Sequence, residues 1–132
     1  MRMLRALMLA AIFAGAAVAQ DAKTKADFGY ATVALALESM RAKSGVKTSM
    51  QSGWTVIEDP STQSLWSFTP PGHSAHPSAV HRKVITEGDG ILVQSNVLCE
   101  ASKPACDAVV AEFNKLDQAV RESLRPKPPA NR

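Results

Sequence analysis

The side chains with the most chemical potential in this chain are its three histidines, which lie within nine positions of one another: His73, His76 and His81. Imidazole is the commonest metal ligand in proteins, and it titrates near neutral pH. Two histidines three positions apart on a proline-stiffened loop could bind one Zn²⁺ or Cu²⁺. A structural zinc site takes four ligands, so aspartate or glutamate from elsewhere would have to complete it. We keep this metal site as an alternative interpretation.

The favoured interpretation gives the same segment a role in binding a partner or a small ligand. Pro70, Pro71 and Pro77 stiffen the segment, and a stiff loop loses little entropy when it binds. Trp66 and Phe68 precede the loop and could line a neighbouring groove, although aromatic side chains are also common in cores. The candidate binding residues are Trp66, Phe68, His73, His76 and His81.

No residue pattern predicts catalysis. Ser74 follows His73, but a nucleophile and base also need an orienting group and an oxyanion site. Glu58 and Asp59 are adjacent carboxylates at a predicted hairpin turn, where we interpret them as solvated charge. We therefore name no catalytic residue and favour a protein that is not an enzyme.

The first 19 residues are typical of a cleavable export signal. Arg2 and Arg5 precede an apolar run, and Ala17 and Ala19 are the small residues expected at a cleavage site. The apolar run has about 13 residues, fewer than the roughly 20 that span a bilayer. We expect cleavage after Ala19 and a periplasmic protein without a stable membrane anchor.

Loss of this leader changes the charge of the chain. The count of basic residues falls from 15 to 13 against 12 acidic residues, and the net charge falls from +3 to +1. A nucleic-acid-binding protein usually carries a clustered basic face. The near-neutral mature chain therefore gives no reason to expect a nucleic-acid partner.

The two cysteines, Cys99 and Cys106, are expected to form a disulfide in an oxidising compartment. The closed loop is short, and the chain-entropy relation gives it about 2 to 3 kcal/mol of stabilisation. Redox-active pairs typically have two residues between the cysteines at the start of a helix, whereas six lie between these. We therefore expect a structural bond.

Residues 20–125 are long enough for one domain, and the proline-rich residues 126–132 are expected to be a disordered tail. We expect a helix at about 27–44 capped by Asp27, a flexible segment at 46–53, and strands at 54–58, 65–69, 79–87 and 91–99. The final helix is capped by Ser102 and has Pro104 in its first turn. Its expected apolar stripe is Val109, Phe113, Leu116, Val120 and Leu124.

These elements predict an α+β fold. Two hairpins would form a four-stranded antiparallel sheet, flanked by an N-terminal and a C-terminal helix packed on one face. Trp54 and Trp66 fall on neighbouring strands, where we expect them to pack as an aromatic pair.

The Trp-x-Phe-Thr-Pro element at 66–70, the His-x-x-His-Pro run at 73–77 and the late cysteines resemble small uncharacterised exported proteins of Gram-negative bacteria. That resemblance implies a periplasmic location and no activity. The chain also resembles periplasmic lysozyme inhibitors of the Ivy type, through its size, export, helix-flanked sheet and the Lys103 and Pro104 pair between the cysteines. Those inhibitors present a histidine from the loop, and this loop contains none. Lysozyme inhibition is therefore a minor alternative.

Overall fold

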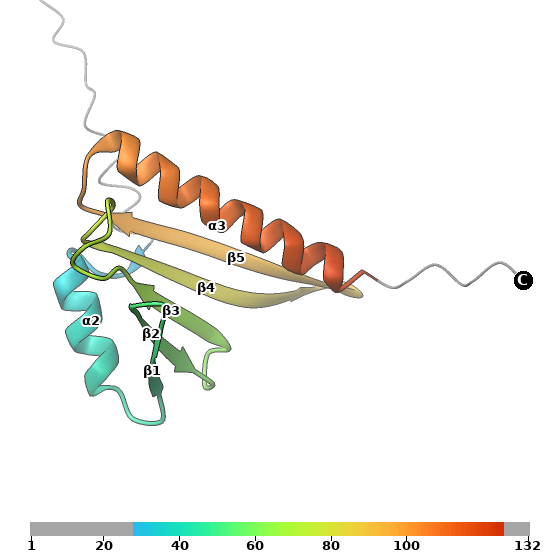
Figure 1. Cartoon of the computed structure of the whole chain (residues 1–132). Coiled ribbons are helices and arrows are strands. Elements are labelled where there is room, and N and C mark those ends of the chain that lie inside the picture. Colours follow the sequence, from blue (N-terminus) through green and yellow to red (C-terminus); the bar gives the residue numbers. More distant parts are fainter. Residues whose placement is uncertain (1–27, 126–132) are drawn as a thin grey trace, which may run out of the picture.

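A computed structural model describes residues 28–125 as one five-stranded sheet with two helices (Figure 1). In chain order the elements are α2 (Val33–Ala42), β1 (Lys47–Gln51), β2 (Trp54–Asp59), β3 (Ser64–Phe68), β4 (Ser78–Glu87), β5 (Gly90–Cys99) and α3 (Lys103–Ser123). The strands lie in the order β1-β2-β3-β4-β5, and each neighbouring pair is antiparallel. The α+β class is confirmed, and the expected count of four strands is wrong.

Several expectations concern residues that the structure does not describe. The predicted signal peptide (1–19), the Asp27 cap and the predicted tail (126–132) all lie outside residues 28–125. Among residues 28–125, no helix is both long and apolar enough to cross a membrane.

The additional strand is β1, in the segment that was expected to be flexible. It pairs with β2 through a two-residue turn at Ser52 and Gly53, whose φ angles are +51° and +83°. Two consecutive positive φ values are typical of a type I′ hairpin turn, which glycine favours. Every residue of β1 is exposed, so its sequence has no apolar alternation that would indicate a strand.

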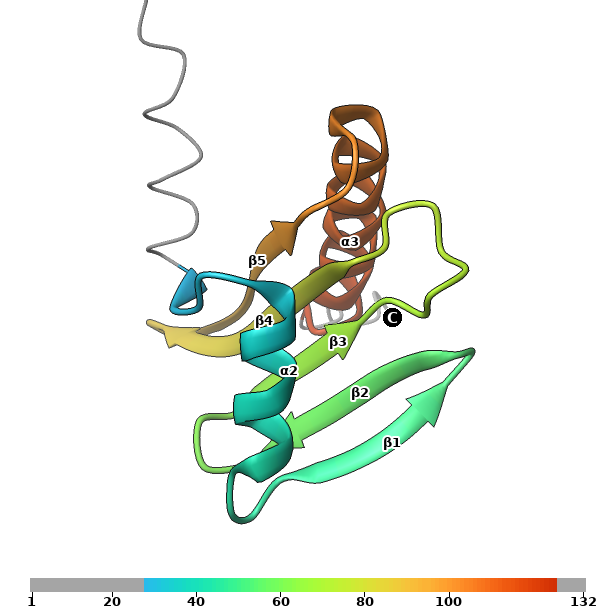
Figure 2. The same cartoon turned by 90° about the vertical axis from the view of Figure 1, so that its left-hand side faces the viewer.

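The two helices pack against opposite faces of the sheet, so the expectation of one shared face is wrong (Figure 2). Leu98 of β5 belongs to the cluster formed by α2, whereas its neighbours Val97 and Cys99 pack against the cluster that contains Val109 of α3. Successive side chains of a strand point to opposite faces. Consecutive buried residues such as Ala79 and Val80 give the sheet two apolar faces, which we name the α2 face and the α3 face.

Trp54 and Trp66 lie on neighbouring strands, as expected, but they do not form a pair. Trp66 is opposite Ile57 in the β2–β3 register and packs on the α2 face. Trp54 is three positions before Ile57 and packs on the α3 face, against Phe113 at a ring-centroid distance of 5.7 Å. The odd separation between Trp54 and Ile57 is what places the two indoles on opposite faces.

Helix α2 begins later than expected. Its N-cap is Thr32, whose hydroxyl accepts the Leu35 N–H at 3.2 Å. Gly29 has a φ of +89°, which is incompatible with a right-handed helix through that position. Glu100 Oε1 accepts the Val33 N–H at 2.8 Å, so a carboxylate beyond the end of β5 also satisfies a free donor at the helix start.

Helix α3 begins as expected and is tied to the sheet by a disulfide. The Ser102 hydroxyl accepts the Ala105 N–H at 3.4 Å, and Pro104 lies in the first turn. The Cys99–Cys106 disulfide, with Cα atoms 5.7 Å apart, joins the end of β5 to this turn.

The apolar stripe expected along α3 is only partly present. Val109 and Phe113 are buried, whereas Leu116 and Leu124 are 46% and 49% exposed. Asp117 is buried in the second half of the helix. The sheet-facing surface of α3 is therefore apolar near its start and charged near its end.

Candidate functional site

The segment Pro70–Pro77, which we name the histidine loop, joins β3 to β4 and is closed at its base by Thr69 and Ser78. The Thr69 N–H donates to the Ser78 carbonyl at 3.1 Å, and the Ser78 N–H donates to the Thr69 hydroxyl at 2.9 Å. Both residues are buried. The loop therefore leaves the sheet from a fixed pair of hydrogen-bonded residues.

The interior of the histidine loop is also ordered by its own contacts. Ala75 is 1% exposed and belongs to the cluster with Val80, Val109 and Phe113. The Ser78 hydroxyl donates to the Ala75 carbonyl. Two turns close within the loop, since the N–H groups at positions 73 and 76 each donate at 3.0 Å to the carbonyl three residues earlier. The loop is anchored at its centre as well as at both ends.

His73 and His76 lie on this loop with different surroundings. The His73 ring packs edge-on against Trp54 with centroids 5.1 Å apart, and its Nδ1 accepts the Ala75 N–H at 3.0 Å. His76 is exposed, and its Nδ1 lies 3.0 Å from the Thr69 hydroxyl and 3.1 Å from the Thr69 carbonyl oxygen. The Nδ1 atom of each ring therefore already has a partner within the protein.

His81 is on β4, away from the loop. It stacks on Trp66 of the α2 face, with ring centroids 4.0 Å apart and planes at 18°. Burial lowers the pKa of this imidazole below 6.5, and the positive charge of Lys83 adds to that effect. The structure therefore places His73 and His76 on one loop and His81 elsewhere. Among residues 28–125, no three or more histidine, cysteine, aspartate or glutamate side chains converge as metal ligands.

Trp66 and Phe68, the aromatic candidates, belong to the core. They are 6% and 2% exposed and pack in the cluster on the α2 face. The aromatic side chain that accompanies the histidine loop is instead Trp54, which is half-buried. A side chain built at Gly53 would meet Pro70 at 3.7 Å, so the β1–β2 turn approaches the loop closely. The serine–glycine pair before Trp54 could have indicated the β1–β2 turn, whereas its approach to the loop is a tertiary contact.

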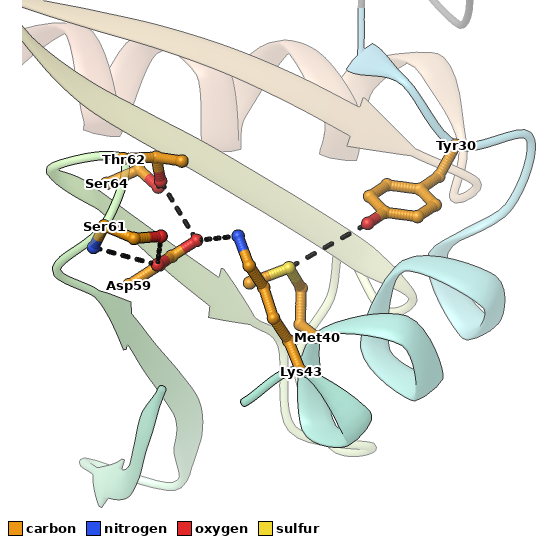
Figure 3. Close-up of polar contacts among 7 residues, drawn as sticks. All are labelled: Tyr30, Met40, Lys43, Asp59, Ser61, Thr62 and Ser64. Atoms are coloured by element: carbon orange, nitrogen blue, oxygen red, sulfur yellow. Dashed lines mark hydrogen bonds and ion pairs between the residues drawn. The ribbon is translucent and has the colours of Figure 1, made fainter. Parts of the chain in front are cut away.

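Asp59 is a buried carboxylate, which contradicts its interpretation as solvated charge (Figure 3). It pairs with Lys43 of the α2–β1 connection, accepts the Ser61 N–H and hydroxyl at 3.2 and 2.6 Å, and accepts the Thr62 hydroxyl at 3.0 Å. The hydrogen bond from Lys43, aided by those from Ser61 and Thr62, holds the pKa of Asp59 well below its usual range. An aspartate whose oxygens bind its own turn is typical of an Asx turn, so the role of Asp59 is structural. Glu58 is exposed, as expected.

A second buried carboxylate lies between α3 and the sheet. Asp117 Oδ1 accepts from Arg82 Nη2 at 2.9 Å and Nε at 3.0 Å, and Oδ2 accepts the Ser95 hydroxyl. The Arg82 guanidinium carbon also lies 5.9 Å from the centre of the Phe113 ring. This ion pair, in which two guanidinium nitrogens donate to one carboxylate oxygen, fixes the second half of α3 over β4 and β5.

A groove of about 530 Å³ lies beside this pair, between β5 and the second half of α3. Its lining residues are Val93, Gln94, Ser95, Asn114, Asp117, Gln118, Arg121, Glu122 and Arg125. The sequence patterns did not indicate this groove, because its two walls come from β5 and α3, which only the fold brings together.

The loop between the cysteines differs from the presentation that the lysozyme-inhibitor resemblance implies. Lys103 and Pro104 form the first turn of α3, and Lys103 Nζ pairs with Asp107 at 2.8 Å. Comparisons of the chain with protein families, with curated proteins and with solved structures found no match.

Proposed function

We propose that this protein is an exported, non-enzymatic binding domain of the periplasm and that the histidine loop is its binding element. The observation that carries the proposal is the anchoring of the loop at Thr69, Ala75 and Ser78. A loop held in one conformation before binding loses little further entropy in a complex. This property distinguishes it from an ordinary flexible surface connection.

The exposed groups of the loop suit recognition of another protein. Pro71, Ser74 and His76 are exposed, and the half-buried rings of Trp54 and His73 pack against each other beside them. Aromatic side chains with one polar end are common anchors of protein interfaces. The partner we propose is a periplasmic protein that packs on the Trp54–His73 ring pair and hydrogen-bonds the His76 imidazole.

The periplasmic location rests on the leader pattern, and the Cys99–Cys106 disulfide supports it because such bonds persist in oxidising compartments. Mass spectrometry of protein purified from the periplasm tests the leader directly. We expect a mature chain that begins at Gln20. A chain that retains Met1 and stays in the cytoplasm contradicts the proposal.

Site-specific photo-crosslinking in cells tests the binding element. A photoreactive phenylalanine analogue replaces Ser74 in one variant and Lys115, an exposed residue of α3 outside the loop, in a matched control. We expect a discrete cross-linked protein from position 74 and none from position 115. Adding His76→Ala should weaken the adduct from position 74. An adduct from position 115 alone, or no adduct from position 74, refutes the proposal.

A further inference from the structure

We infer that the outer edge of β5, which pairs with no other strand of residues 28–125, is a second docking site that accepts an extended peptide segment of another protein as a sixth strand of the sheet. This edge is long, regular and uncharged. Strand β5 is last in the strand order, spans ten residues, pairs with β4 in an unbroken register and contains no charged residue. The other edge strand, β1, has five residues and begins with Lys47.

This contrast matters because proteins normally protect exposed sheet edges. Short length, charged side chains, proline or a bulge discourages pairing with a foreign strand. Among these devices β1 has short length and a lysine, whereas β5 has none along its register with β4. Helix α3 covers one outward group of β5, the Val93 carbonyl, through Arg121. A long, uncharged and regular edge is the surface that strand addition requires.

The register identifies the backbone groups that point outward. Glu87 and Gly90 flank a two-residue turn, so Gly90 and the alternate residues after it hydrogen-bond to β4. The N–H and carbonyl groups of the intervening residues 91, 93, 95 and 97 therefore point away from the sheet. Arg121 Nη2 agrees with this assignment, because it donates to the Val93 carbonyl at 3.3 Å.

The groove beside β5 gives an added strand a second wall. Residues 93–95 form one side, and Gln118, Arg121 and Arg125 lie among the α3 residues of the other. A strand hydrogen-bonded to β5 would direct alternate side chains toward α3. Backbone bonds would supply affinity, and these alternate side chains would supply specificity.

The charges of the groove favour a peptide with carboxylate side chains on that face. Asp117 is paired with Arg82, so its charge is balanced. Arg121 and Arg125 form no ion pair with another residue of the described part of the chain, and Glu122 is the remaining acidic residue of the groove. A peptide N–H that takes the Val93 carbonyl would release Arg121 from its hydrogen bond. Two arginines against one carboxylate would then complement an acidic strand.

A second copy of this chain complements the edge less well than an acidic segment does. Antiparallel pairing of two β5 strands would place both α3 helices, and with them Arg121 and Arg125 of both copies, on the same face of the joined sheet. Like charges on one face repel, whereas the carboxylates of an acidic extended segment attract both arginines.

Nuclear magnetic resonance of the 15N-labelled mature protein tests this inference with two defined probes. One nine-residue peptide alternates valine and glutamate, and the other has lysine in place of glutamate. We expect the glutamate peptide to shift the amide signals of Ile91, Val93, Ser95 and Val97, and to bind about tenfold more tightly than the lysine peptide. Signals of the histidine loop should stay unchanged, which separates this result from any test of the proposed function.

Two variants with the same charge change locate the interaction. Arg125→Glu should abolish the preference for the glutamate peptide, while Lys115→Glu, on an exposed α3 residue outside the groove, should preserve it. The inference is overturned by an absence of β5 shifts at about 2 mM peptide, or by an equal preference in Arg125→Glu and the unaltered protein. Concentration-dependent dimerisation with the same β5 shifts would assign the edge to a second copy and would also overturn it.

Discussion

The Thr69→Val substitution tests whether the histidine loop is anchored as described. The threonine hydroxyl accepts the Ser78 N–H at 2.9 Å, and Ser78 is fully buried. Valine has a similar shape but no acceptor, so the Ser78 N–H would remain buried without a partner. Loss of that acceptor should lower the free energy of unfolding by about 1 to 3 kcal/mol. The same substitution also removes the hydroxyl next to His76 Nδ1.

Urea unfolding followed by tryptophan fluorescence measures this loss, because the protein has two tryptophans, both in the sheet. Thr86→Val is the matched control, since Thr86 is an exposed threonine of β4, and it should change the free energy of unfolding by less than about 0.5 kcal/mol. Hydrogen exchange should also accelerate at the loop amides in Thr69→Val alone. Equal stability of the two variants would refute the anchoring argument.

Three further predictions follow from the charged and cross-linked groups. Asp117→Ala leaves the mostly buried Arg82 guanidinium without its partner, so we expect the free energy of unfolding in urea to fall by about 3 to 5 kcal/mol. Asp107→Ala, in an exposed pair, should leave the urea midpoint unchanged, and equal effects of the two substitutions would contradict the burial argument. Burial lowers the pKa of His81 below 6.5, so the unfolded chain binds more protons near that pH, and the melting temperature should fall as the pH drops from 7.5 to 5. This pH dependence should flatten in His81→Phe, and an unchanged slope in that variant would contradict the assignment to His81. Cys99→Ser opens the bond between β5 and α3 and should lower stability by about 2 to 3 kcal/mol, whereas an unaltered melting temperature would show that the bond does not stabilise the fold.

The features that the sequence predicted correctly depend on local signals. The start of α3 follows from Ser102 and Pro104. The β4–β5 hairpin was predicted from Asp89 and Gly90 between apolar runs, and it forms with Gly88 and Asp89 as the two turn residues. The disulfide follows from two cysteines and the expected compartment. Each of these inferences needs only neighbouring residues or composition.

The features that the sequence missed depend on contacts between distant segments. Strand β1 has no buried residue, so only its partner β2 defines it. Asp59 and Asp117 resemble surface charges until the fold brings Lys43 and Arg82 to them. The placement of the helices on two faces likewise follows from packing, because a strand with apolar residues on both faces can accept a helix on either.

The candidate site shows the same division. His73 and His76 lie on one loop that the proline pattern identified, whereas His81 is close in sequence but lies on a strand against Trp66. Trp54 contacts His73 of the loop, which is 19 positions later in the chain, and no periodicity in the sequence predicts that contact. Trp66 and Phe68 show the more common outcome for aromatic residues in a small protein, which is burial in the core.

The most direct test of the central claim is cross-linking from position 74 in living cells, compared with cross-linking from position 115 of α3. If the anchored histidine loop is the binding element, position 74 yields a discrete adduct that weakens with His76→Ala, and position 115 yields none. Absence of an adduct from position 74 would contradict the claim that this loop binds a partner.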